Sequence, residues 1–171
     1  MKNNSLYLNK IWGMFLIIVI PLFFGSCTKS FDKKIAEHIE SKCQRFDETN
    51  GCLIDLQDIT VFEWDSMYVF AGLTTCEDIY NALGFTFKCK HVPDNYIRIL
   101  FVKGKQVVYQ SQYYALSGKV QFRSYRKEDV AFLHYTKGLS RFYVLKKNKT
   151  LEKEVFYDLY PESGEREPRY R

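Results

Sequence analysis

The chain has 171 residues, of which 25 are basic and 20 acidic, so its formal net charge is +5. Hydrophobic residues make up 46% and charged residues 26%, which excludes intrinsic disorder for most of the length. The length predicts one domain, and the basic excess is too small to indicate a nucleic-acid partner. An aromatic content of 17% favours β-structure.

The first 26 residues have the three parts of a secretory signal peptide. Lys2 and Lys10 precede an apolar run over residues 11–24, and the small residues Gly25 and Ser26 follow it. A transmembrane helix needs about 20 apolar residues, which is more than this run supplies. The segment therefore predicts a signal that is cleaved rather than a permanent membrane span.

A cysteine follows the small pair, and the segment Phe24-Gly25-Ser26-Cys27 resembles a bacterial lipobox of the relaxed Bacteroidota kind. The resemblance implies that Cys27 is acylated and anchors the mature protein in the bilayer. More than one acyl chain would make this attachment stable. The alternative is an ordinary signal peptide followed by an incidental cysteine.

The expected tether is short, since only residues 27–31 precede the folded domain. No acidic cluster follows Cys27. We therefore expect a location in the outer membrane facing the periplasm, with exposure on the cell surface as the alternative.

Four cysteines remain beyond the anchor, and an even number in an oxidising compartment indicates two disulfides. A helix from Cys76 followed by a returning strand would bring Cys89 back to it. Cys43 and Cys52 flank a polar loop that can close on itself. Sequential pairing, Cys43–Cys52 and Cys76–Cys89, is therefore expected. No pair has zinc-ligand spacing, so neither a metal nor a cofactor is predicted.

Two helices are predicted. Apolar residues within 32–46 are spaced as on one face of an amphipathic helix. Thr75 and Asp78 have the spacing of a capping box at the start of the second helix. Gly84 suits the position just after its last turn.

Short aromatic-rich runs separated by turn residues predict β-strands. The expected strands cover residues 52–56, 66–71, 96–103, 106–114, 119–125, 129–135, 139–146 and 150–160. Apolar residues on both faces of 96–103 indicate a central strand. The expected fold class is α+β: two helices packed on one curved, mainly antiparallel sheet with meander order. It forms a single domain over 32–161, and a charged, flexible tail follows over 162–171.

A strand motif of the form Phe-x-Trp-Asp-x-x-Tyr-x-Phe runs from Phe62 to Phe70, and a short helix ending in Leu83-Gly84 follows. This part of the chain, residues 58–84, resembles small uncharacterised envelope lipoproteins of Bacteroidota type. The resemblance implies an envelope location and brings no activity with it.

The catalytic candidates are few. Asp55, Asp58 and Asp65 form an acidic cluster together with Glu63, and such carboxylates can perform acid–base work. His134 is a second candidate, within a predicted strand. Turn capping and ordinary packing explain the same residues equally well, and no nucleophile or phosphate-loop motif is present. An envelope hydrolase is therefore an alternative function.

Tyrosine is abundant, with 13 residues, and suits interfaces because its apolar ring carries a polar tip. The candidate binding residues are Trp64, Tyr109, Tyr113, Tyr125 and Tyr135. The function expected first is a non-catalytic module that binds a protein partner, of which an inhibitor or immunity protein is one version. A structural envelope lipoprotein, with these tyrosines packed inside the sheet, is the third possibility.

Overall fold

The computed structural model describes residues 29–44, 46, 51–124, 132–148 and 155–162. The predicted signal, the anchor Cys27 and most of the predicted tail lie outside these residues. Within them the chain forms two α-helices, α2 (Phe31–Lys42) and α3 (Cys76–Leu83). No helix in the described part combines the length and apolar character needed to cross a membrane.

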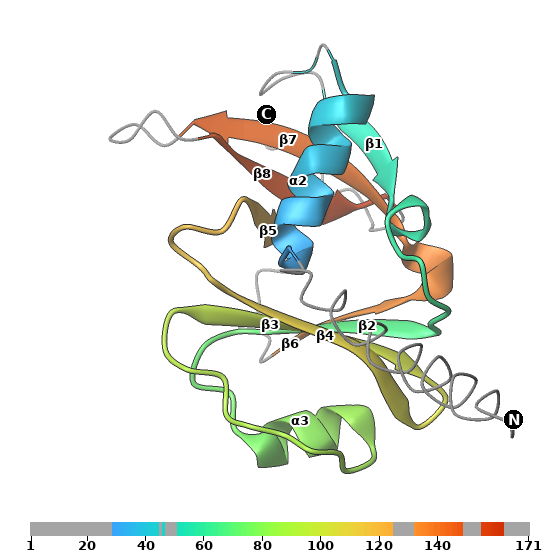
Figure 1. The fold of residues 1–171 in the computed structure, drawn as a ribbon, viewed down its shortest axis with the longest axis vertical. Coiled ribbons are helices and arrows are strands. Elements are labelled where there is room, and N and C mark those ends of the chain that lie inside the picture. The colour runs from blue at the N-terminus through green and yellow to red at the C-terminus, as the bar shows by residue number, and fades with distance from the viewer. Residues whose placement is uncertain (1–28, 45, 47–50, 125–131, 149–154, 163–171) are drawn as a thin grey trace, which may run out of the picture.

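Among the described residues, eight strands form two four-stranded sheets (Figure 1). The first sheet has the order β1-β7-β8-β5, and the second has the order β4-β3-β2-β6. Their bounds are β1 (Cys52–Asp55), β2 (Ser66–Phe70), β3 (Tyr96–Lys103), β4 (Gln106–Tyr114), β5 (Val120–Phe122), β6 (Phe132–Thr136), β7 (Arg141–Asn148) and β8 (Val155–Pro161). All neighbouring strands are antiparallel except β5 and β8, which are parallel.

The α+β class and the mainly antiparallel pairing are confirmed, but the single sheet with meander order is wrong. Strands β2, β3 and β4 are consecutive neighbours, as a meander requires. However, β6 returns to pair with β2, and β7 crosses to pair with β1. Local patterns predict that a strand exists, whereas the choice of partner depends on contacts between distant segments.

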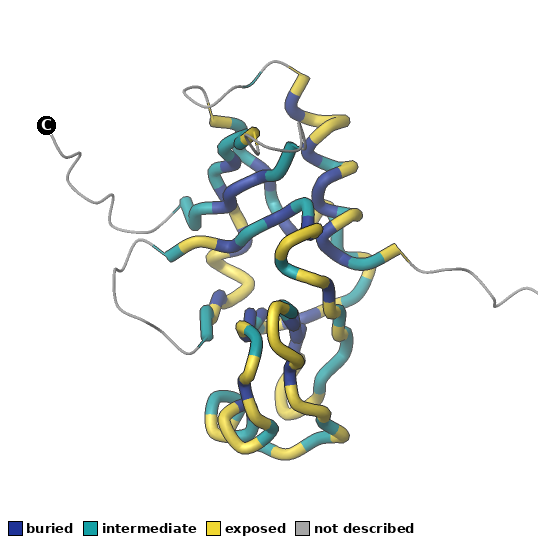
Figure 2. Tube along the Cα trace, turned by 90° about the vertical axis from the view of Figure 1, so that its left-hand side faces the viewer, coloured by how far each residue is buried: buried dark blue, intermediate teal, exposed yellow. Residues whose placement is uncertain are grey.

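The main core lies between α2 and the two sheets. Helix α2 contributes Phe31, Ile35 and Ile39, each almost fully buried, and the two sheets contribute residues such as Phe101 and Phe142. Figure 2 shows buried and exposed positions alternating along α2. The predicted amphipathic pattern is therefore present, in a helix that ends at Lys42 rather than at residue 46.

Helix α3 covers the opposite face of the second sheet, where Ile79 packs with Phe70, Val92 and Leu100 in a second buried cluster. Because both faces are covered, β3 is buried along most of its length and occupies an interior position, as predicted. The capping box is also present: the Thr75 side chain accepts a hydrogen bond from the Asp78 amide at 3.2 Å.

Both sequential cysteine pairs are joined. Cys43 is bonded to Cys52 and Cys76 to Cys89, with a Cα–Cα distance of 5.9 Å in each case. The first bond connects the end of α2 to the first sheet. The second connects the start of α3 to the segment 85–95, which leads from α3 to β3 and forms no strand, so the returning strand expected to carry Cys89 is wrong although the pairing is confirmed.

Candidate functional site

Trp64 lies in the core rather than at a surface. Its side chain is 1% exposed and packs edge-on against Phe101, with ring centroids 5.1 Å apart. The indole N–H donates a hydrogen bond to the Thr60 hydroxyl at 3.0 Å, so its polar atom is satisfied internally. This position leaves no surface of Trp64 for a partner.

Two of the candidate tyrosines are also internal. Tyr113 and Tyr135 are 6% and 5% exposed, and their hydroxyls donate to the carbonyls of Val120 and Arg123. Burial raises the pKa of both hydroxyls, so they stay protonated. These contacts fit the structural alternative, in which the tyrosines pack within the sheets.

Tyr109 is half-buried, and its ring stacks on Phe62 with a centroid distance of 4.9 Å. The Lys34 ammonium lies 5.7 Å from the centre of the same ring. Tyr109 therefore has a partly accessible side chain within β4. Tyr125 lies outside the described residues.

The carboxylates of the acidic cluster do not converge on one site, because each contacts a different group of the chain. Asp55 accepts from the Gln57 amide at 2.9 Å and caps the 3-10 helix η2 (Leu56–Asp58). Asp58 pairs with Lys42 at 2.9 Å, which lowers the pKa of that carboxyl.

Further along the same segment, Asp65 accepts from the Gly104 amide at 2.7 Å. Glu63 pairs with Lys103, and this pairing lowers the pKa of the Glu63 carboxyl. A general acid needs a raised pKa, and here Asp58 and Glu63 are shifted the other way. The structure thus gives these acids roles in turns and ion pairs.

His134 lies on β6 and stacks on Tyr68, with ring centroids 4.5 Å apart. Desolvation by burial lowers the pKa of its imidazole. In the part of the chain that the structure describes, no group of three or more His, Cys, Asp or Glu residues could hold a metal ion. The position of His134 is explained by ring packing.

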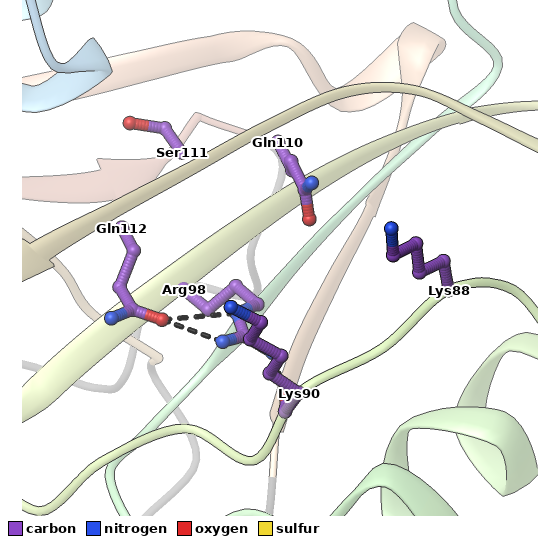
Figure 3. A pocket seen from close by; sticks show the side chains of 6 residues that line it. All are labelled: Lys88, Lys90, Arg98, Gln110, Ser111 and Gln112. Atoms are coloured by element: carbon purple, nitrogen blue, oxygen red, sulfur yellow. Dashed lines mark hydrogen bonds between the residues drawn. The ribbon is translucent and has the colours of Figure 1, made fainter.

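A different site lies beside β4. A pocket of about 460 Å³ is lined by Lys88, Lys90, Arg98, Gln110, Ser111 and Gln112 (Figure 3). A second pocket of about 420 Å³ is lined by Phe85, Phe87, Lys88, Lys105, Gln106, Val107, Val108, Tyr109 and Gln110. Lys88 and Gln110 line both, so the two pockets adjoin along β4, and together we call them the β4 groove.

The groove follows the edge of a strand. Strand β4 is the outermost strand of the second sheet, with β3 as its neighbour on one side. Every residue from 105 to 112 lines the groove. Side chains alternate between the two faces of a strand, so an unbroken run of lining residues means that the main chain itself is reached.

Arg98 is the most buried charge in the groove, with 8% of its surface exposed. Its guanidinium donates to the Gln112 side-chain oxygen at 2.6 and 3.2 Å and to the carbonyls of Lys90 and His91. All these partners are neutral, and desolvation lowers the pKa of the guanidinium. Burying an arginine without a carboxylate is unfavourable.

The other described arginines differ from Arg98. Arg123 pairs with Asp158 at 2.8 Å, and Arg141 pairs with Glu162 at 3.0 Å. The first pocket contains three cations and no acid, a formal charge of +3. This part of the fold therefore carries positive charge that none of the lining residues neutralises.

The wall that carries Lys88 and Lys90 is fixed in place. Cys89 lies between these two lysines and is bonded to Cys76 at the start of α3. The Tyr80 hydroxyl donates to the Phe87 carbonyl at 3.0 Å, and Arg98 binds the Lys90 carbonyl from the other side. These bonds attach the wall to both α3 and the second sheet.

Sequence reasoning missed this site. Lys88, Lys90 and Arg98 belong to a polar loop and a central strand, and only the fold brings them together. The alternation Lys88-Cys89-Lys90 was the available signal, because a disulfide holds both lysines on one wall. Comparison of the chain with family models, curated proteins and solved structures finds no match, so the site is interpreted from its own geometry.

Proposed function

We propose that the protein is a lipid-anchored, non-catalytic module of the bacterial cell envelope that binds a protein partner. The observation that carries this proposal is the β4 groove, which combines an accessible strand edge with unneutralised positive charge. Strand edges are common sites of protein recognition because their main chain can pair with another chain. The Asp55, Asp58 and Asp65 carboxylates are engaged in turns and an ion pair, so no specific observation favours a hydrolase.

The envelope location in this proposal rests on the lipobox-like segment ending in Cys27, and the two disulfides are consistent with an oxidising compartment. We place the module in the outer membrane, facing the periplasm. Growth with an alkyne-bearing palmitate tests the anchor. The wild-type chain should be labelled and the Cys27→Ser variant unlabelled. An unlabelled wild-type chain would remove the membrane anchor from the proposal.

Site-specific photocrosslinking in intact cells tests the binding role. A photoreactive amino acid replaces Gln110, an exposed residue of the groove, or Glu37, an exposed residue of α2. A discrete protein adduct should form from position 110 and not from position 37. The same adducts from both positions, or only lipid and abundant porins, would contradict a protein partner at the groove.

A further inference from the structure

The chemistry of the groove indicates what kind of partner it takes, an inference that rests on the proposed binding function. We infer that the β4 groove binds an acidic segment in extended conformation, which pairs with the edge of β4 and places carboxylates beside Lys88, Lys90 and Arg98. Three independent features support this assignment: the charge of the groove, its position along a strand edge, and the apolar side chains at its far end.

The first feature is the positive charge of the groove. Several exposed cations elsewhere in the described chain pair with a carboxylate, as in Lys42–Asp58 and Lys103–Glu63. The lining cations of the first pocket form no such pair among the described residues. A ligand that brings carboxylates would neutralise this charge and gain charge-assisted hydrogen bonds. Figure 3 shows the two lysine side chains extending from the wall toward the β3–β4 strands.

The strand edge sets the conformation of the ligand. The pairing of β3 with β4 shifts register between Phe101 and Val102, which leaves Val108 unpaired as a bulge. A bulge interrupts regular pairing, so an added strand would pair with β4 beyond it, along Tyr109–Tyr114. Gln110 and Gln112 lie in this regular part and also line the cationic pocket. Main-chain pairing and charge recognition therefore occur at the same place.

The far end of the groove contains apolar side chains beside polar ones. Phe85, Phe87, Val107 and Val108 line the second pocket together with Lys88 and Lys105. In an extended segment, alternate side chains point the same way. A ligand with carboxylates at one end and an apolar side chain at the other would thus match the two pockets in order.

The inference is tested with the full chain purified in a non-ionic detergent. The probe is a fluorescein-labelled peptide with glutamates at alternate positions of one half and valines at alternate positions of the other, and binding is followed by fluorescence anisotropy. The double variant Lys88→Gln/Lys90→Gln should bind about tenfold more weakly, because two attractive charges are lost. The matched control Lys33→Gln/Lys137→Gln has the same net charge, lies outside the lining of both pockets and should bind like the wild type.

Two further peptides separate the parts of the inference. A peptide with glutamine in place of glutamate should lose most of the affinity, and one with methylated alternate amides should lose main-chain pairing. Equal binding of all three peptides, equal weakening by both double variants, or no binding of the acidic peptide would overturn the inference. Such a result leaves an adduct at position 110 in intact cells unaffected, so failure of the ligand class is distinguishable from failure of the proposed function.

Discussion

The acidic segment 55–65 and the β4 groove both concentrate charge of one sign, but the fold treats them differently. In the acidic segment, each carboxylate meets a backbone amide or a lysine, as with Asp65 and the Gly104 amide. In the groove, Arg98 meets only neutral groups. The segment also buries Trp64, whereas the groove leaves a strand edge accessible.

This difference shows which charges serve the fold. A charge that is neutralised by its own chain stabilises a turn or an ion pair and gives no indication of a ligand. A buried charge without a counter-ion destabilises the fold, so a chain that keeps such a charge often uses it for function. The sequence indicates the acidic segment as a candidate site, whereas the structure indicates the groove.

Trp64→Ala should give the largest effect and marks the structural region. Removal of this buried ring should lower the free energy of unfolding by about 4 kcal/mol, because a large cavity forms beside Phe101. Guanidinium unfolding measures the change. Val61→Ala, at a fully exposed position in the same segment, is the control and should change it by less than about 0.5 kcal/mol. Similar losses in both variants would contradict the core position of Trp64.

The two disulfides can be compared directly, because Cys76–Cys89 holds the groove wall and Cys43–Cys52 lies outside the groove. Cys43→Ser/Cys52→Ser and Cys76→Ser/Cys89→Ser should each cost about 3 kcal/mol of unfolding free energy, since they close loops of similar length. Only the second pair holds the groove wall, so only its removal should also weaken binding of the acidic peptide. Anisotropy under conditions where both variants remain folded tests this. Equal affinity for the two variants would mean that the wall does not depend on Cys89.

Removal of the groove lysines should have a smaller and opposite effect on stability. In the absence of a ligand, Lys88→Gln/Lys90→Gln should raise the free energy of unfolding by about 0.5 kcal/mol at low salt, because repulsion with Arg98 is relieved. The gain should disappear at high salt, where the charges are screened. Urea unfolding at two salt concentrations measures it. A loss of stability at low salt would show that these lysines are stabilising in the free protein.

The smallest effect concerns the pair Asp58–Lys42, which is largely exposed. The pair lowers the pKa of Asp58 in the folded state, so its stabilisation is present above the ordinary carboxyl pKa. It is lost as pH falls through the lowered value. Asp58→Asn should cost no more than about 0.5 kcal/mol at neutral pH and nothing at pH values below the folded pKa. Urea midpoints across an acid titration check this, and a pH-independent difference would contradict it.

Many local features of this fold could be predicted from the sequence because they depend on neighbouring residues. The Thr75–Asp78 capping box, the glycine that follows the second helix and the central character of 96–103 all follow from short-range patterns. The sequential disulfides follow from short-range geometry, because Cys43 and Cys52 flank one loop and the chain returns after a short helix to bring Cys89 to Cys76. The resemblance of Cys27 to an acylation site likewise belongs to the sequence and remains a prediction.

Only the tertiary structure decided the strand partners, the burial of Tyr113 and Tyr135, and the site itself. A tyrosine in a strand has the same local pattern whether its face meets solvent or another sheet, so its exposure depends on segments far away in the chain. In the local sequence, Arg98 is only one polar residue within an apolar strand. Its environment arises because a disulfide-held loop packs against it and no acidic residue in the described part of the chain pairs with it, which is a property of the assembled fold.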